Sequence, residues 1–110
     1  MKKKTSGKYL WIAEEGQNYR LGLTNDGQDE LGSITFVSLP KVGSTLIKDE
    51  AFADVEAEKA VTELLSPLNG KVLEVNEKAV DEPSLLDSED EAEAWLLVIS
   101  EVTDEDFQAL

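Results

Sequence analysis

The chain has 110 residues, of which 24 are acidic and ten are basic, giving a formal net charge of −14. A chain of this length forms one domain with a modest core. It contains no cysteine and no histidine, which removes disulfides, thiolate nucleophiles, the commonest general base and the commonest zinc ligand. A strongly acidic surface repels nucleic acids and anionic membranes. We therefore expect neither as a partner, and no catalytic or metal site.

Residues 1–7 carry Lys2, Lys3 and Lys4, three of the ten basic residues. A signal peptide begins in a similar way, but no apolar segment of the required length follows, and no run of residues is long enough to span a membrane. The sequence predicts a flexible basic tail over residues 1–7, a single domain over residues 8–110 and a cytoplasmic location.

The first half of the chain contains short strand patterns separated by turn residues. These patterns predict strands over Tyr9–Ile12, Tyr19–Leu23, Ile34–Leu39 and Thr45–Lys48. Between the second and third strands, Thr24 is a suitable N-cap for a short helix over Asn25–Leu31, and Gly32 is a suitable residue to end it. Gly43 falls in a predicted turn, where we expect a positive φ.

A β-hairpin is predicted from two runs, Phe52–Glu56 and Ala60–Leu65, with Lys59 at the tip between them. Ser66-Pro67 and Asn69-Gly70 then turn the chain into a strand over Lys71–Asn76, and a positive φ is expected at Gly70. A lysine at a hairpin tip extends away from the domain, where an enzyme can bind and acylate it.

The residues around Lys59 are acidic. Glu56, Glu58 and Glu63 are expected to help orient the lysine ammonium and to contribute to recognition of the hairpin by the acylating enzyme. The alternative for Lys59 is an exposed strand lysine in a local ion pair, and for Glu56 a simple outward-facing polar residue.

The last third of the chain predicts one strand and short helical segments. Ala79–Leu86 is irregular or briefly helical, and Asp87–Glu93, with five acidic residues, is a solvated loop. Trp95–Ile99 is apolar throughout and predicts a central strand, and Thr103 opens a short C-terminal helix. Many short strands with helices at the edges indicate a mainly β fold, a small β-sandwich or flattened barrel with short peripheral helices, including one at the C-terminus.

The segment from Val55 to Ala60, followed by Ser66-Pro67, Gly70 and Val72, resembles the lipoyl-attachment hairpin of the glycine cleavage system H-protein family. Other segments match the family in order and near-family spacing. They are Gly22-Leu23-Thr24, Leu31-Gly32, Phe36-Val37, Leu39-Pro40, Val42-Gly43, Val75-Asn76, Val80-Asp81, Pro83 and Trp95-Leu96. The resemblance covers residues 8–110. It implies a lipoyl-type β-sandwich with lipoate in amide linkage on Lys59, and it places Glu56 at an acidic position of the family.

The resemblance also implies a function and partners. A lipoate ligase or an octanoyl or lipoyl transferase would modify Lys59. The lipoyl carrier would then shuttle an aminomethyl group and reducing equivalents among glycine decarboxylase, aminomethyltransferase and dihydrolipoyl dehydrogenase. The chain would be a carrier and not an enzyme. An alternative is a lipoate relay or a regulatory lipoylated protein, for example one linked to ADP-ribosylation. A biotin carrier fits poorly, because its lysine lies between methionines and here the neighbours are Glu58 and Ala60.

One departure from the family concerns the lipoyl arm once it carries the aminomethyl group. Family members have His-Glu-Trp near the start, and the glutamate helps to hold the aminomethyl group, whereas this chain reads Tyr9-Leu10-Trp11. The approach to the last strand, Glu93-Ala94-Trp95, also differs from the family. The resemblance therefore implies an altered pocket for the charged amine, in which Glu63 or Glu14 is a candidate to replace the missing acid.

Overall fold

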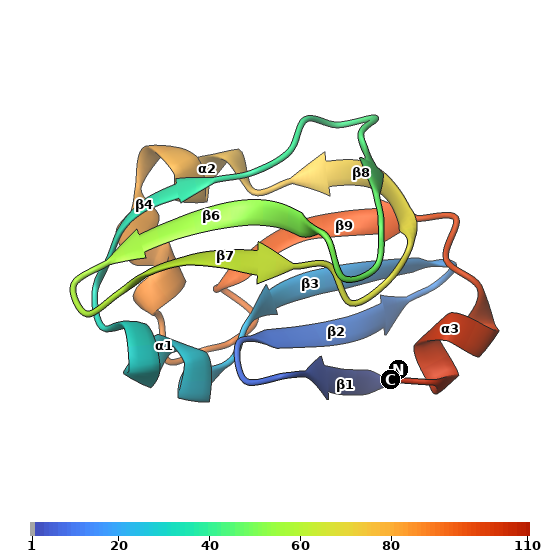
Figure 1. The fold of residues 1–110 in the computed structure, drawn as a ribbon, viewed down its shortest axis with the longest axis horizontal. Coiled ribbons are helices and arrows are strands. Elements are labelled where there is room, and N and C mark those ends of the chain that lie inside the picture. Colours follow the sequence, from blue (N-terminus) through green and yellow to red (C-terminus); the bar gives the residue numbers. More distant parts are fainter. Residues whose placement is uncertain (1) are drawn as a thin grey trace.

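Residues 2–110, the part of the chain that the computed structural model describes, form two antiparallel β-sheets packed face to face (Figure 1). One sheet has six strands in the order β1-β2-β3-β9-β8-β5, and the other has three in the order β4-β6-β7. Apolar residues from both sheets fill the space between them. The prediction of a mainly β sandwich is confirmed.

The six-stranded sheet has an apolar strand near its centre. Its strands are β1 Lys3–Ser6, β2 Leu10–Glu15, β3 Asn18–Leu23, β9 Trp95–Ser100, β8 Gly70–Val75 and β5 Thr45–Leu46. Strand β9 pairs with β3 on one side and β8 on the other, and residues 96–99 are buried. A continuous apolar run fits a strand covered on both faces, so its predicted central place is confirmed.

The N-terminal segment differs from its prediction. Lys3–Ser6 is an ordered edge strand that pairs with residues 10–13 of β2. The Lys3 ammonium lies 2.9 Å from a carboxylate oxygen of Glu91, and Lys4 donates to the carbonyl of Gln108. The prediction of a flexible tail is wrong for these residues, because backbone pairing and acceptors on the acidic body hold them in place. Met1 lies outside the described residues.

The three-stranded sheet contains the predicted hairpin. Its strands are β4 Ile34–Ser38, β6 Ala51–Ala57 and β7 Val61–Leu65. Strands β6 and β7 pair directly, which confirms the hairpin around Lys59. Alternate residues, among them Val37, Val55 and Leu64, are buried against the core, and the residues between them face solvent, as the two-residue period of a strand requires.

Short helices lie around the ends of the sandwich (Figure 1). Helix α1, Asn25–Leu31, has the predicted bounds; Thr24 Oγ1 accepts a hydrogen bond from the Gly27 amide, and Gly32 ends the helix at φ 77°. The region Ala79–Leu86, predicted to be irregular or briefly helical, overlaps α2, Glu77–Asp81, and the 3-10 helix η1, Pro83–Asp87. Helix α3, Asp104–Gln108, begins at the predicted cap Thr103. Within residues 2–110, no helix has the length and apolar character needed to cross a bilayer.

The two predicted turn glycines behave differently. Gly43 has φ 94°, as expected, but Gly70 begins strand β8 and is absent from the positive-φ residues of the described chain. A methyl group added at Gly70 would lie 3.0 Å from the carbonyl oxygen of Ser100. The prediction for Gly70 is therefore wrong: glycine is needed there because a neighbouring strand approaches closely.

Candidate functional site

Lys59 is exposed in the turn between β6 and β7, at the same end of the molecule as α1 (Figure 1). The amide of Ala57 donates to the carbonyl of Ala60 and closes the turn. The turn therefore has a defined shape, and the lysine side chain begins at a fixed place on the surface.

The chain around α1 holds the base of this turn. The Lys59 amide donates to the Leu31 carbonyl, and the Glu58 amide donates to the Ser33 carbonyl, each at 2.9 Å. These bonds form because α1 ends at Gly32, whose positive φ redirects the chain past the hairpin tip. The backbone of the hairpin tip is therefore fastened to the end of a helix.

The side chain of Lys59 has few polar contacts. Its Nζ donates to the carbonyl of Asp29 at 3.3 Å, and it forms none of the ion pairs among residues 2–110. A single long hydrogen bond at an exposed site contributes little to stability. The amine is accessible, and little has to be broken before it reacts.

The three predicted recognition residues do not surround the Lys59 ammonium. Glu56 lies on β6, Glu58 on the turn and Glu63 on β7, and all three are exposed. None of them forms an ion pair with Lys59 in the described part of the chain. The expectation that they orient the ammonium is not supported, whereas their exposure leaves them available to another protein.

The acidic residues that share a cleft with Lys59 come from elsewhere in the sequence. This cleft, of about 660 Å³, is lined by Lys59 together with Asp29, Asp87 and Glu89, and by polar residues of α1. Sequence reasoning missed these acids as neighbours of the lysine. The signal that could have found two of them, Asp87 and Glu89, is the acidic run at residues 87–93, which from the sequence alone is interpreted as a solvated loop.

Two carboxylates of the acidic run at residues 87–93 have hydrogen-bond or ion-pair partners in other parts of the chain. Asp87 accepts a hydrogen bond from the Ile34 amide, and Glu91 accepts one from the Asn25 amide while pairing with Lys3. Partial burial raises the pKa of Glu91, but the Lys3 ammonium and the Asn25 amide outweigh it, and the pKa is lowered overall. These two carboxylates fasten the loop to β4 and α1.

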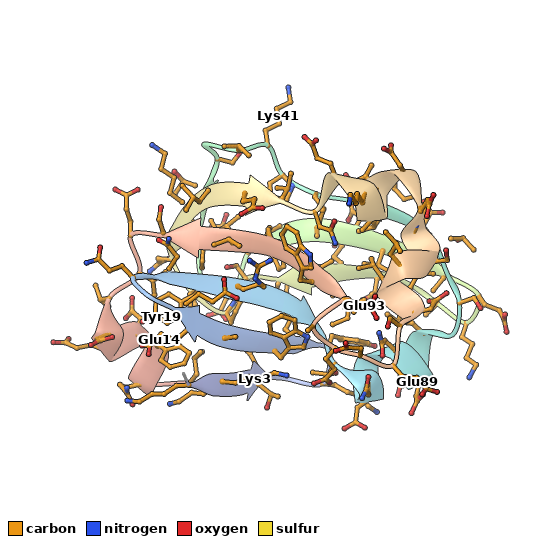
Figure 2. The ribbon with its side chains drawn as sticks, turned by 180° about the vertical axis from the view of Figure 1, so that it is seen from behind. Lys3, Glu14, Tyr19, Lys41, Glu89 and Glu93 are labelled. Carbon is orange, nitrogen blue, oxygen red and sulfur yellow. The ribbon has the colours of Figure 1, made fainter. Side chains whose placement is uncertain are left out.

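A second cavity, of about 330 Å³, brings Leu10 and Glu63 together. Lys8 and Tyr9 line it from the N-terminal side, and residues 63–67 line it from the hairpin side. Figure 2 places Glu14 at the far end of the six-stranded sheet, next to α3, and Glu89 at the α1 end. Of the two candidate acids, only Glu63 lies on the cavity that contains Leu10.

Lys8, which lines this cavity, forms an ion pair with α1. The Lys8 ammonium is 2.6 Å from a carboxylate oxygen of Glu30 on α1. The hydrogen bond and charge of Lys8, with a smaller contribution from the charge of Lys59, lower the pKa of Glu30. The ion pair connects Lys8, which lines the cavity, to α1.

Comparisons with known proteins agree on one family. The family model described as glycine cleavage H-protein matches residues 2–110. The glycine cleavage system H protein of Bacillus subtilis (strain 168) is 44% identical over 94 residues, which is 86% of this chain and 74% of the relative. That of Listeria innocua is 40% identical over 100 residues, covering 91% of this chain and 80% of the relative. The crystal structure of a glycine cleavage system H protein from Mycobacterium marinum has a TM-score of 0.78 at 29% identity, covering 96% of this chain and 92% of that one.

The fold, the exposed hairpin lysine and these likenesses point to one class of protein, the lipoyl carriers with a mainly β fold. The chain belongs to the glycine cleavage H-protein family. The alternative of a lipoate relay or regulatory protein is not favoured by these comparisons.

Proposed function

We propose that this chain is a lipoyl carrier of the glycine cleavage system and that Lys59 is its attachment residue. The observation that carries the proposal is the place of Lys59 in a chain of this family: an exposed amine with no ion pair among residues 2–110, on a hairpin tip whose backbone is fastened to α1. Such a residue offers its Nζ to an enzyme while the domain stays folded.

The residues present fit this modification. Acylation requires the neutral amine of Lys59 to attack an activated acyl carbonyl: the amide C–N bond forms, the bond to the leaving group breaks, and the amine loses a proton. Among residues 2–110, the hydrogen bond to the Asp29 carbonyl is the one polar contact of Nζ that has to be given up. Once attached, a lipoyl group supplies a dithiolane that accepts a one-carbon amine and two electrons.

The fixed backbone of the hairpin tip also fits a carrier function. The bonds of the Lys59 and Glu58 amides to Leu31, the last residue of α1, and to Ser33 hold the start of the arm, while the arm itself stays free. A tethered group reaches successive active sites at a high local concentration. We propose glycine decarboxylase, aminomethyltransferase and dihydrolipoyl dehydrogenase as those partners, and a lipoate ligase or an octanoyl or lipoyl transferase as the modifying enzyme.

The cavity that contains Leu10 and Glu63 is the proposed place for the amine carried by the lipoyl arm. Glu63 is four positions after Lys59, so at most about 13 Å of fully extended chain joins them. Leu10 is buried and offers no hydrogen-bond acceptor, so a protonated amine placed beside it alone would be poorly paired. We propose that Glu63, on the same cavity, supplies a charge-assisted acceptor in its place.

The test is reconstitution of glycine cleavage. The lipoylated protein is mixed with a decarboxylase, an aminomethyltransferase and a dihydrolipoyl dehydrogenase, and glycine-dependent formation of NADH is followed. Wild type is expected to support the reaction, and Lys59→Arg, which keeps the charge but not the acylatable amine, is expected to give only background. A wild-type rate equal to that of Lys59→Arg would contradict the proposed function.

A further inference from the structure

The outer face of the three-stranded sheet carries exposed apolar residues beside Lys59. Phe36 on β4, Glu56 on β6 and Val61 on β7 lie directly opposite one another in the pairing register. Residues paired in this way point to the same face of a sheet. Phe36 is 47% exposed and Val61 is 75% exposed, so the row has an apolar group at each end and a carboxylate in the middle.

A second row on the same face is polar and acidic. Ser38, Asp54 and Glu63 are paired across the three strands, and all are exposed. Neither Asp54, Glu56 nor Glu63 forms an ion pair within residues 2–110. Helices lie at the ends and edges of the sandwich and leave this face open in Figure 1.

Apolar groups surrounded by unpaired charges of one sign are typical of a protein-binding surface. The charges on this one are negative, and they complement a basic surface on the partner. Val61, the first residue of β7, is two positions after Lys59, so at most about 7 Å of chain joins them. A protein that covers the row therefore covers the base of the lysine as well.

We propose that the row Phe36–Glu56–Val61, with Asp54 and Glu63 beside it, is the docking surface for the enzyme that acylates Lys59. This inference rests on the proposed function. An acylating enzyme has to bring its activated acyl group to Nζ itself, so it must contact the hairpin. Partners that act later meet the far end of the arm and do not need this face. The matching surface on the enzyme is basic around an apolar centre.

The inference assigns a role to Phe36, which lies 23 positions before Lys59 in the sequence and joins the hairpin only through the pairing of β4 with β6. A peptide containing the hairpin alone lacks this residue. The whole sheet, and not only the residues next to Lys59, therefore presents the substrate.

The experiment measures the initial rate of Lys59 acylation by a lipoate–protein ligase supplied with lipoate and ATP, by mass spectrometry. Phe36→Ser and Val61→Ser are compared with Leu73→Ser and Val42→Ser, exposed apolar controls of 49% and 61% exposure outside the three-stranded sheet. We expect kcat/KM to fall about tenfold or more in the first pair, mainly through KM, and to stay within about twofold in the controls. Higher salt should weaken wild-type acylation as the acidic row is screened.

Circular dichroism and thermal melting check that each variant is folded. If Phe36→Ser does not fold, the acylation rate of Val61→Ser alone tests the docking surface. If wild type is acylated at Lys59 and both Phe36→Ser and Val61→Ser react as fast as the controls, the proposed docking surface is wrong, but the proposed function is not affected. Absence of acylation in wild type would instead overturn the proposed function. Variants that are already lipoylated should be reduced normally by dihydrolipoyl dehydrogenase, and an equal loss there would refute the assignment to the acylating enzyme.

Discussion

Gly32 links the end of α1 to the attachment hairpin, and its replacement by alanine tests that link. Gly32 has φ 77° and ψ −155°, a conformation open essentially to glycine, in which another residue costs of order 1–3 kcal/mol. The added methyl group would also lie 3.3 Å from Lys59 Cγ and 3.4 Å from Glu58 Cβ. Both side chains are exposed and can move by a few tenths of an ångström, so the backbone strain is the larger cost.

We therefore expect Gly32→Ala to lower the free energy of unfolding by about 1–3 kcal/mol, measured by urea unfolding with the fluorescence of Trp11 and Trp95. For a domain near this size, each kcal/mol corresponds to a fall of about 4–8 °C in Tm. Acylation at Lys59 should be retained, because the amine itself is not displaced from solvent.

Gly16→Ala is the matched control. Gly16 also has a positive φ, 64°, but a methyl group there meets nothing within 4 Å and lies in the β2–β3 turn. It should cost about 1–2 kcal/mol and leave the acylation rate unchanged. A loss for Gly32→Ala under about 0.5 kcal/mol, the range of ordinary surface changes, would refute the reasoning about the helix end.

Three further changes test other parts of the molecule. Gly70→Val should cost about 1–3 kcal/mol by overpacking against Ser100 and Val102; a variant as stable as wild type would show that the strands separate easily. Glu91→Gln should lower the free energy of unfolding more at neutral pH than well below pH 4.5. A carboxylate with a lowered pKa stabilises the fold above its unfolded pKa and loses this effect as the pH falls through its folded pKa. The same loss of stability at both pH values would contradict a stabilising Lys3–Glu91 ion pair. Glu63→Gln should slow glycine–bicarbonate exchange by the lipoylated protein with glycine decarboxylase, because it removes the proposed acceptor for the amine, and adding Leu10→Glu should restore the rate; a rate unchanged by Glu63→Gln would contradict that role of Glu63.

Local patterns in the sequence predicted the elements that depend on local chemistry. Thr24 and Gly32 marked the two ends of α1, and the apolar run at Trp95 marked the central strand, because caps and burial act within a few residues. The hairpin was predicted from its flanking runs and the turn residues that follow it.

Features that depend on distant contacts were missed or mistaken. Lys3–Ser6 pairs with β2 although its lysine-rich sequence suggests a tail, and Gly70 is a close-approach glycine because of Ser100, thirty positions later. The acids that share a cleft with Lys59 are Asp29, Asp87 and Glu89, not its sequence neighbours. Spacing along the chain cannot show which loops the fold brings to one end of the sandwich.

The most direct test of the account is the location of the lipoyl group. The full chain is incubated with a lipoate ligase, lipoate and ATP, and the product is weighed intact and mapped as peptides. The account predicts one added lipoyl mass, on the peptide that contains Lys59, and no addition to Lys59→Arg, whose fold is retained. Modification of Lys41, Lys48 or Lys71 instead, or continued addition to Lys59→Arg, would contradict it.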